Sequence, residues 1–478
     1  MRIIILGAGL SGLTCAVTLK KQGHEVVLLE KNTAPGGLAQ SFRVDGFTFD
    51  YGPHYLFGKK VVQAIQKEFP AIELNRLDGT KEKMFFHQKY FAFPFDPKNI
   101  LFNMDKSRMP RIVGELLLRR LFSSAKGQQS QNLEDWIIGA VGRGIYDYIS
   151  LSGYIQKLYG LAPSEISNEW GKQKLKFLAQ WREADLIKLV AKSFSEGRNL
   201  EKRIIHYPDD GGIDHLSIKL TEDFISRGGE VLLNSEAVHV NHQDTGVEVT
   251  YSRNGELKRS VADFLISTIP ITRLVEILTP NLSWEVRQEI KSLTYRNLLL
   301  LCLCIDKEYI LDDQCIYFTE KPFIFRRITE FKHFDLNMAP EGKTSLCLEI
   351  TCSPAEALYH APNEDIFKLV IEQLERYDYL KYEDVLKYYL IRIPFAYPVY
   401  QMSYQKILEK VLDSLRGYHN LISSGRQGLF LYNAMNKSII EGYEISHKIS
   451  ASDPVVGKEI IDDWYHQRLM QFKSDARH

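Results

Sequence analysis

A glycine-rich turn between two apolar runs at the N-terminus constrains the fold of this chain more than any other feature. The run Arg2–Leu6 predicts a buried parallel strand, and Gly7-Ala8-Gly9-Leu10-Ser11-Gly12 follows it directly. The segments Leu13–Gln22 and Glu25–Leu29 then predict a helix and a second strand, and Glu30 lies 18 residues after Gly12. Strand, Gly-x-Gly-x-x-Gly, helix, strand and acid in this order are typical of dinucleotide-binding domains.

Each position in this arrangement has a physical reason. Gly7 allows the tight turn, Gly9 lets the backbone approach a pyrophosphate, and Gly12 lets the helix pack closely on the sheet. The helix N-terminus offers unpaired N–H groups and a positive dipole end to phosphates, while Glu30 can accept hydrogen bonds from ribose hydroxyls. The alternative is a glycine-rich turn in an ordinary αβ layer. The predicted dinucleotide-binding residues of this segment are Gly7, Gly9, Leu10, Ser11, Gly12, Glu30 and Lys31.

A second glycine pair follows the acid. Gly36-Gly37-Leu38 precedes a short hairpin pattern, Ser41–Asp50, and then Tyr51-Gly52-Pro53-His54. A nicotinamide-binding domain does not require this second pair. The layout resembles the FAD motif of the superfamily of amine oxidases, protoporphyrinogen oxidases and UDP-galactopyranose mutases. The resemblance implies FAD as the cofactor, with Gly37, Leu38, Gly52, Pro53 and His54 beside it.

The same resemblance extends over most of the chain in separate blocks. They are Gly153-Tyr154-x-x-Lys157 with Pro163-Ser164-Glu165, Tyr207–Gly212, Ser267-Thr268-Ile269-Pro270, Arg327–Phe334 and Gly425–Tyr432. Arg327–Phe334 resembles a mutase motif, and Gly425–Tyr432 resembles the terminal FAD motif. The resemblance implies further cofactor contacts at Val238 (through its backbone), Thr268, Gly425, Arg426, Met435 and Asn436.

Three positions depart from the mutase pattern. Tyr159 stands where mutases have a tryptophan, and the segment Asn433–Asn436 lacks the usual acid. A second diphosphate-binding arginine is expected near position 177, where Lys174 and Lys176 are the nearest cations. Lysine does not reproduce the bidentate chemistry of arginine. The resemblance is therefore specific for the superfamily and leaves the activity open.

The order of elements predicts an α/β protein. A Rossmann-like, glutathione-reductase-like FAD-binding domain is assigned to the discontinuous segments 1–80, 203–285 and 415–455. A mixed α+β substrate domain is inserted into it, with a largely helical substrate or cap subdomain at 81–202 and a strand-rich part at 286–414. Helices are expected at about 214–226, 364–377 and 437–449, and one of the strands at Phe323–Ile328.

The composition of the chain limits the kinds of binding partner that we expect. The 478 residues are too many for one ordinary core, and 60 Lys and Arg balance 60 Asp and Glu, which gives no support for a nucleic-acid partner. The six cysteines lack metal spacing, so buried reduced thiols and no metal are expected. No apolar run reaches the roughly 18 residues that span a bilayer. A basic amphipathic pattern at 108–126 is assigned to a solvated helix rather than to membrane contact. We expect a cytoplasmic protein with a small-molecule substrate, for which a nucleotide sugar is one candidate.

Three residues are the candidates for chemistry. His54 would act beside the flavin, or it would be a hydrogen-bonded core histidine. Arg327, in an apolar strand, would bind an anion or form a salt bridge with Glu330 or Glu349. Tyr432 would line the substrate cleft. The leading hypothesis is an FAD-dependent oxidoreductase that transfers a hydride from substrate to flavin N5. The alternatives are a mutase-like enzyme that isomerises a nucleotide sugar with reduced FAD, and a flavin-binding protein without turnover.

Overall fold

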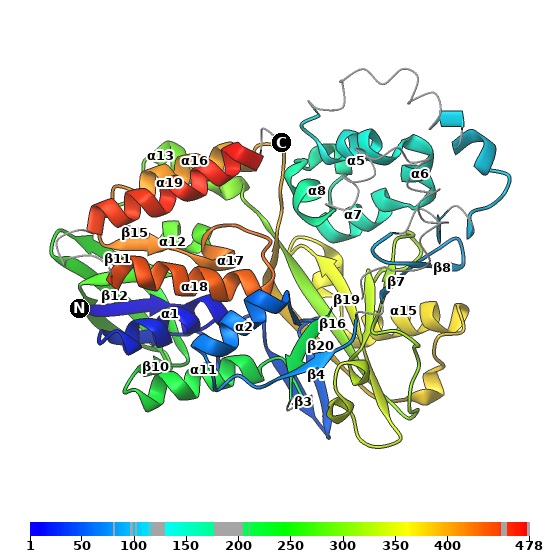
Figure 1. The fold of residues 1–478 in the computed structure, drawn as a ribbon, viewed down its shortest axis with the longest axis horizontal. Helices are drawn as coiled ribbons and strands as arrows, with labels where there is room; N and C mark the ends of the chain where they lie inside the picture. The colour runs from blue at the N-terminus through cyan, green and yellow to red at the C-terminus, as the bar shows by residue number, and fades with distance from the viewer. Residues whose placement is uncertain are drawn as a thin grey trace.

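The computed structural model describes residues 1–79, 82–95, 99–100, 103–112, 114–115, 130–175, 204–209, 211–450 and 457–475 (Figure 1). Most of the predicted basic helix 108–126 lies outside these residues, as does Lys176.

A five-stranded parallel sheet forms the dinucleotide-binding half of the molecule. Its strand order is β10-β2-β1-β14-β21, and all four pairings are parallel. The strands are β1 (Arg2–Leu6), β2 (Glu25–Leu29), β10 (Glu230–Leu232), β14 (Phe264–Ser267) and β21 (Leu421–Ser423). Distant parts of the chain therefore meet in one sheet, and the predicted Rossmann-like fold is confirmed.

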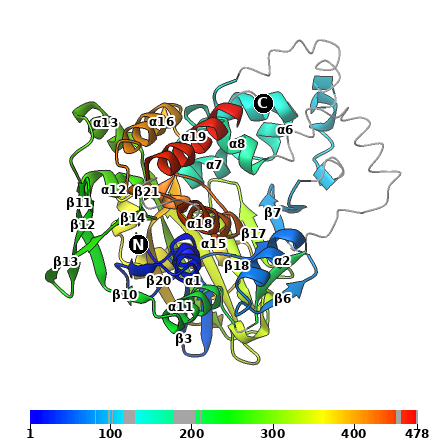
Figure 2. The same ribbon diagram turned by 60° about the vertical axis from the view of Figure 1, so that its left-hand side comes forward.

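Helices and a small second sheet cover this parallel sheet. Helix α1 (Leu10–Lys21) packs against α11 (His215–Ser226) and α18 (Met435–Ser450), which lie beside it in both ribbon views (Figure 2). An antiparallel meander, β11 (Ser235–Gln243), β12 (Gly246–Arg253) and β13 (Glu256–Ala262), contacts β1, β2 and β14. The short strand β15 (Leu278–Thr279) pairs with β11. Both sides of the parallel sheet are thus removed from water, as continuous apolar strands require.

A C-terminal helix that the sequence analysis did not predict closes the edge of this sheet. Helix α19 (Gly457–Asp475) packs against α16 (Tyr404–Leu415) and α18. The Trp464 indole Nε1–H donates to the Ser423 carbonyl (3.1 Å), and the Ser423 N–H donates to the Tyr465 hydroxyl (2.7 Å). Both aromatic side chains are fully buried. They satisfy backbone groups of the edge strand β21 that would otherwise be unpaired.

A seven-stranded mixed sheet forms the second half, in the order β20-β16-β19-β18-β17-β7-β8. Every residue of β16 (Tyr295–Ile305) is buried, because the sheet has a core on each face. Leu298, Leu300 and Cys302 contribute to the core shared with the dinucleotide half. The alternate residues Leu299, Leu301 and Leu303 pack with helix α15 (Asn363–Arg376) in a separate core. This alternation follows from the two-residue period of a strand.

The other strands of this sheet come from two parts of the chain. They are β7 (Glu82–Phe86), β8 (Lys89–Ala92), β17 (Cys315–Phe318), β18 (Arg327–Glu330), β19 (Thr344–Cys352) and β20 (Val385–Pro398). The hairpin β7–β8 lies within the segment 81–202, and its strand β7 pairs with β17 in parallel. The substrate sheet therefore includes residues from before and after the dinucleotide-binding segment 203–285.

Four short helices sit above the large sheet, at the upper right of Figure 1. They are α5 (Leu133–Val141), α6 (Arg143–Tyr148), α7 (Leu151–Tyr159) and α8 (Glu169–Lys174). Helix α7 approaches the sheet closely, because a Cβ at Gly153 would lie 2.3 Å from the Thr319 carbonyl oxygen. The Lys157 ammonium donates to the carbonyls of Phe318 (3.1 Å) and Phe325 (3.4 Å). The Gly-Tyr-x-x-Lys pattern thus anchors this helix to the sheet.

The predicted strand Phe323–Ile328 is wrong in its first four residues. Strand β18 begins at Arg327, and the preceding residues form an irregular turn. Phe323 and Phe325 are nevertheless buried in the core beneath α15, so the apolar run that suggested a strand reflects packing of a turn. The helices expected at 214–226, 364–377 and 437–449 are confirmed as α11, α15 and α18.

Candidate active site

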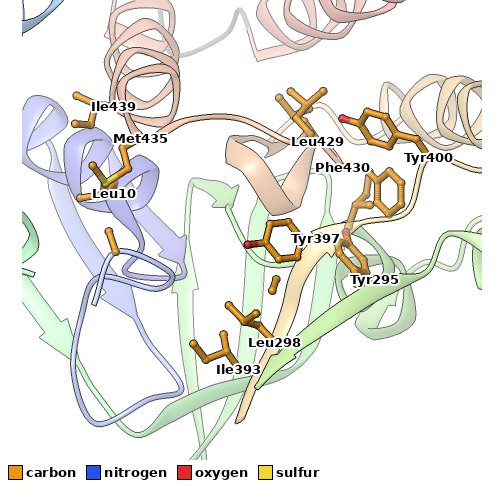
Figure 3. Packing of buried hydrophobic residues seen from close by; sticks show 14 of the residues in the cluster. Leu10, Tyr295, Leu298, Ile393, Tyr397, Tyr400, Leu429, Phe430, Met435 and Ile439 are labelled. Atoms are coloured by element: carbon orange, nitrogen blue, oxygen red, sulfur yellow. The ribbon is translucent and has the colours of Figure 1, made fainter. Parts of the chain in front are cut away.

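A cavity of about 1010 Å³ lies between the two sheets. Figure 3 shows Leu10 and Met435, from helices α1 and α18, on the side opposite Leu298, Ile393 and Tyr397 of the large sheet. The predicted site residues that line the cavity are Gly7, Gly9, Leu10, Ser11, Glu30, Lys31, Gly37, Leu38, Pro53, His54, Thr268, Arg327, Gly425, Arg426, Tyr432 and Met435. Segments more than 400 residues apart in the chain thus share one chamber.

Four predicted cofactor residues do not line the cavity. Gly12 packs against the backbone of the first glycine turn, since a Cβ at this position would lie 2.0 Å from the Gly7 carbonyl oxygen. Gly52 adopts φ 144° beside His54. The cavity wall near Val238 is made by its neighbours Ser235, Glu236 and Ala237. Asn436 is buried, and its side-chain amide donates to the Phe57 carbonyl.

The first glycine turn is held by the acid that follows β2. The Glu30 carboxylate accepts hydrogen bonds from the Ala8 N–H (2.8 Å) and the Asn32 N–H (2.9 Å). The second glycine loop closes on the same turn, because the Gly36 N–H donates to the Ala8 carbonyl (2.7 Å). Gly36 has φ 116°, a conformation that glycine adopts without a steric penalty. The two glycine motifs therefore form one continuous backbone surface.

This surface fits a pyrophosphate. A Cβ at Gly9 would meet nothing within 4 Å, so the backbone there faces open space. Gly9 supplies no side-chain cap to helix α1, which leaves the first helical N–H groups directed at the cavity. The Ser11 hydroxyl is buried without a hydrogen-bond partner. An anionic group with several oxygen acceptors would satisfy these donors.

The second half of the dinucleotide site comes from the end of β21. Gly425 adopts φ 76°, and a Cβ there would lie 3.0 Å from the Ser11 side chain. Helix α17 (Gly425–Gly428) follows. The Arg426 guanidinium donates to the carbonyls of Asn433 and Ala396 (2.8 Å to Ala396), and its Nε–H is buried without a partner. Arg426 thus ties the terminal glycine turn to strand β20.

The His54 segment is held from behind by a buried carboxyl group. Asp50, the last residue of β4 (Phe47–Asp50), accepts hydrogen bonds from the Tyr207 hydroxyl (2.6 Å), the Ile213 N–H (3.0 Å) and the Ser41 hydroxyl (2.7 Å). Burial raises the pKa of Asp50 to about 7 despite these hydrogen bonds. The Tyr207–Gly212 block noted in the sequence therefore supports the segment that enters the cavity.

His54 is a neutral imidazole in the cavity wall. Burial, together with the nearby Arg327 charge, lowers the pKa of His54 to about 4, while the Glu349 carboxylate opposes this shift. Its Nδ1 atom is buried and has no hydrogen-bond partner. The structure does not show the hydrogen bond that a satisfied core histidine would have. It leaves a hydrogen-bonding atom available beside the chamber.

Two consecutive arginines share one buried carboxylate next to His54. The Arg327 Nε–H donates to Glu349 Oε1 (2.7 Å), and the Arg326 guanidinium donates to Glu349 Oε2. Burial alone would lower the pKa of both arginines, but Glu349 raises both above their usual value. Burial alone would likewise raise the pKa of Glu349, and the arginines lower it instead. The cluster holds two positive charges and one negative charge.

Tyrosine hydroxyls complete this cluster. Arg326 donates to the hydroxyls of Tyr154 (3.3 Å) and Tyr397, and Arg327 donates to the Tyr317 hydroxyl (3.2 Å). Arg326 is almost fully buried, with 1% of its side chain exposed, whereas 14% of the Arg327 side chain is exposed. Arg327 therefore presents the charge of the cluster to the cavity, and Arg326 supports it from behind.

Cations also surround the tyrosine at the end of the terminal motif. The Lys174 ammonium lies 4.0 Å from the centre of the Tyr432 ring, and the Arg426 guanidinium lies 4.7 Å from it. Tyr397 meets Tyr432 edge-on, with ring centres 5.3 Å apart. Lys174 enters the cavity where the sequence analysis looked for a second arginine. These contacts place positive charge on the aromatic faces that line this end of the chamber.

From the sequence we singled out Arg327 but not Arg326. Glu330 and Glu349 were both left open as partners of Arg327. The structure selects Glu349. Glu330 accepts instead from the N–H groups of Ile310 (3.0 Å) and Leu311 (2.7 Å), and so anchors a loop. Adjacent strand residues normally point to opposite faces, so two consecutive arginines in a regular strand would not reach one carboxylate. Because β18 starts at Arg327, Arg326 lies in the preceding turn and can reach the same carboxylate.

The described residues contain neither a metal site nor a membrane-spanning helix. No group of three or more His, Cys, Asp or Glu side chains there is arranged to hold a metal ion. No helix in the described ranges combines the length and the apolar character needed to cross a membrane. All six cysteines are buried and free, as expected.

Comparisons with known proteins agree with this site. The model of the flavin containing amine oxidoreductase family matches residues 10–431. A 4,4'-diapophytoene desaturase from Staphylococcus aureus (strain COL) is 38% identical over 101 residues, which is 20% of this chain and 20% of the desaturase. The chain is thus matched to about a fifth of the length of such curated relatives.

Solved structures share the fold. A reduced UDP-galactopyranose mutase superposes with a TM-score of 0.80 at 22% identity, covering 96% of this chain and 98% of the mutase. A protein from Exiguobacterium sp. 255-15 with the provisional name protoporphyrinogen oxidase gives 0.74 at 16% identity, covering 95% and 99%. A putrescine oxidase bound to putrescine gives 0.62 at 16% identity, covering 95% and 100%.

The match to the family model spans most of the chain, and the glycine motifs form a surface that fits a dinucleotide. The prediction of FAD as the cofactor is confirmed by a family that is flavin-containing. The chain belongs to the flavin containing amine oxidoreductase family.

Proposed function

We propose that this protein is an FAD-dependent oxidoreductase that removes a hydride from a C–H bond of an anionic small molecule. The observation that carries the proposal is the distribution of charge along the cavity. Lys174, Arg327 and Arg426 line the end that faces the large sheet. Within the described part of the chain, the carboxylates that line the cavity are Glu30, Glu236 and Glu276.

These three carboxylates belong to the dinucleotide end. Glu30 is bound to the first glycine turn, and Glu276 forms an ion pair with Arg273 at 2.7 Å, with Glu236 also near this arginine at 3.8 Å. Glu349, the carboxylate nearest the substrate end, is shared by two arginines and is fully buried. An anionic substrate would therefore be attracted to this end of the cavity, whereas a cationic amine would be repelled.

The contacts of the tyrosine rings also favour a negatively charged substrate. An amine cation can be recognised by the faces of aromatic rings. Here the faces of Tyr432 and Tyr397 already contact Arg426, at 4.7 Å and 5.7 Å from their ring centres. Lys174 also lies over Tyr432. We infer that a carboxylate or phosphate fits between these rings better than an ammonium group.

FAD bound in the cavity would supply a hydride acceptor at N5. The chain itself would supply orientation and charge. Arg327 would hold the anionic group of the substrate, and the His54 ring, which lines the cavity, would lie beside it as a neutral group. His54 suits this role because it stays neutral above its lowered pKa of about 4. Tyr432 would close the opposite side of the substrate pocket.

A nucleotide-sugar mutase is the second candidate, and one observation favours it. Arg327, within the mutase-like motif, lines the cavity near two further cations, which suits a diphosphate. However, Lys174 would have to replace the second arginine as a point charge. We therefore rank the mutase below the oxidoreductase.

An anaerobic flavin assay separates the two functions. The oxidised holoprotein would be screened with carboxylated and phosphorylated metabolites, with matched neutral and amine compounds as controls, and flavin absorbance would report reduction. We expect bleaching by an anionic compound. Bleaching by amines alone would overturn the substrate charge that we propose. Conversion of UDP-galactopyranose to the furanose by dithionite-reduced protein, with the flavin still reduced, would establish the mutase instead.

A further inference from the structure

Two phenylalanines have a left-handed backbone conformation. Phe395 has φ 54° and Phe430 has φ 52°. This region is unfavourable for bulky side chains, so it persists only where the surroundings impose it, and such residues are concentrated at functional sites. The two surroundings differ. Phe430 is fully buried and packs against Tyr295 (Figure 3), whereas Phe395 lines the cavity.

A bulge in strand β20 produces the conformation of Phe395. Arg296 is opposite Tyr397 and Leu298 is opposite Ile393, so three residues of β20 face the single residue Asn297 of β16. Bulges of this kind bend the strand and re-aim a side chain. In the two-residue alternation of the strand, Phe395 would share the face of Ile391 and Ile393, which also line the cavity. The bulge therefore changes how the Phe395 ring is presented on that face.

Three side chains hold the bulge in place. The Asn297 side-chain carbonyl accepts from the Phe395 N–H (3.1 Å), and the Gln427 side-chain amide donates to the Phe395 carbonyl. Arg426 donates to the next carbonyl, that of Ala396, at 2.8 Å. Two of these three side chains come from α17, the helix at the terminal glycine turn. The strained residue is thus tied directly to the second half of the dinucleotide site.

The Phe395 ring lies between the two cofactor-binding segments. On one side it meets Tyr295 edge-on, with ring centres 5.3 Å apart. On the other side the Lys31 ammonium lies 5.8 Å from the ring centre. Lys31 follows Glu30 at the end of β2, in the opposite wall of the cavity. The ring therefore spans from the large sheet towards the dinucleotide-binding sheet.

We infer that Phe395 is a cofactor-contacting residue. The bulge turns its ring out of the large sheet and presents an apolar face to the dinucleotide, which it shields from water. We attribute the strain at Phe395 to this placement of the ring against the dinucleotide. This inference depends on the flavin cofactor of the family and is independent of the substrate that we propose.

The test compares Phe395→Gly with Phe395→Tyr. Glycine accepts the left-handed conformation but removes the ring, so we expect the FAD dissociation constant of the apoprotein, measured by flavin fluorescence, to rise about tenfold. The melting temperature of the apoprotein should stay the same or rise. Tyrosine keeps the ring, so Phe395→Tyr should bind FAD within about threefold of the parent.

Phe430→Gly is the matched control, because it removes a ring from the same backbone conformation without removing a cavity contact. It should lower the melting temperature of the apoprotein by leaving a void in the core. The inference is overturned if Phe395→Gly binds FAD within twofold of the parent. It is also overturned if the FAD affinity of Phe395→Gly falls only together with a loss of melting temperature like that of Phe430→Gly. A Phe395→Tyr protein that binds FAD as weakly as Phe395→Gly would overturn it as well.

Discussion

The two ends of the cavity differ, because backbone groups form one end and side chains form the other. The dinucleotide end is a backbone surface in which Gly9 faces open space, Gly36 closes the second glycine loop on the first, and the N-terminus of α1 presents N–H groups. The substrate end is made of side chains, with Arg326, Arg327 and Glu349 in mutual contact. Backbone donors can serve any dinucleotide, whereas a side-chain cluster can change with each residue. The first end therefore indicates the cofactor, and the second determines the chemistry.

The largest expected effect is in the side-chain cluster. Glu349→Gln leaves two buried guanidiniums without a carboxylate, which should cost about 3–5 kcal/mol of the free energy of unfolding. Chemical denaturation of the parent and variant measures this difference. Glu383→Gln is the control, because Glu383 pairs with Lys381 at the surface and should contribute less than about 1 kcal/mol. A cost below that of the control would mean that the cluster is not held together by its charges.

Two glycines should separate packing from cofactor binding at the backbone end. Gly12→Ala places a Cβ 2.0 Å from the Gly7 carbonyl oxygen, so the apoprotein should lose about 1–3 kcal/mol of stability. Gly9→Ala meets no atom within 4 Å, so its apoprotein should change by less than about 1 kcal/mol. It should nevertheless lose about tenfold in FAD affinity, because the new methyl group occupies pyrophosphate space. Denaturation and FAD titration of both variants measure this contrast; unchanged FAD binding by Gly9→Ala would contradict the assigned pyrophosphate position.

A further expected effect is a pH dependence that arises from His54. Its pKa is lowered from the usual 6.5 to about 4, so between these values the unfolded chain binds more protons than the folded protein. The resulting contribution of His54 to the free energy of unfolding is fully present above pH 6.5 and is lost as the pH falls towards 4. Its slope is at most about 1.4 kcal/mol per pH unit.

Denaturation of apoprotein at several pH values would show this term as a difference between the parent and His54→Gln. Asp50, whose pKa is raised, contributes a slope of the opposite sign in both proteins, so its effect cancels in the difference. Parallel stability curves for the two proteins between pH 4 and 6.5 would contradict a neutral, buried His54.

The contrast between the two ends also explains what could be predicted from the sequence. The glycine turn, the acid Glu30 and their strands are local in sequence, and the periodic apolar runs around them specify their structure. The Arg326–Glu349 contact depends on where β18 begins, and the apolar run Phe323–Ile328 did not indicate that start. The left-handed Phe395 depends on a bulge opposite Asn297, and its sequence resembles an ordinary strand.

The helix α19 shows the same limit at the end of the chain. Trp464 and Tyr465 are used to satisfy one residue of an edge strand, Ser423. A periodic pattern in the sequence does not predict such a contact, because the two aromatic residues lie more than 40 residues from the backbone that they contact. The prediction placed the end of the FAD-binding segment at 455 and assigned no role to the residues after it.

This placement of β21 and α19 sets an order of events during synthesis. Most of the glycine surface of the cavity is made by residues 7–37, but Gly425 and Arg426, which complete it, are translated almost 400 residues later. The side chains that cover the edge of β21 follow later still. A growing chain therefore exposes half of a dinucleotide site while the intervening residues are translated. Cofactor capture has to wait until β21 and helix α17 have been made and have joined the first half of the site.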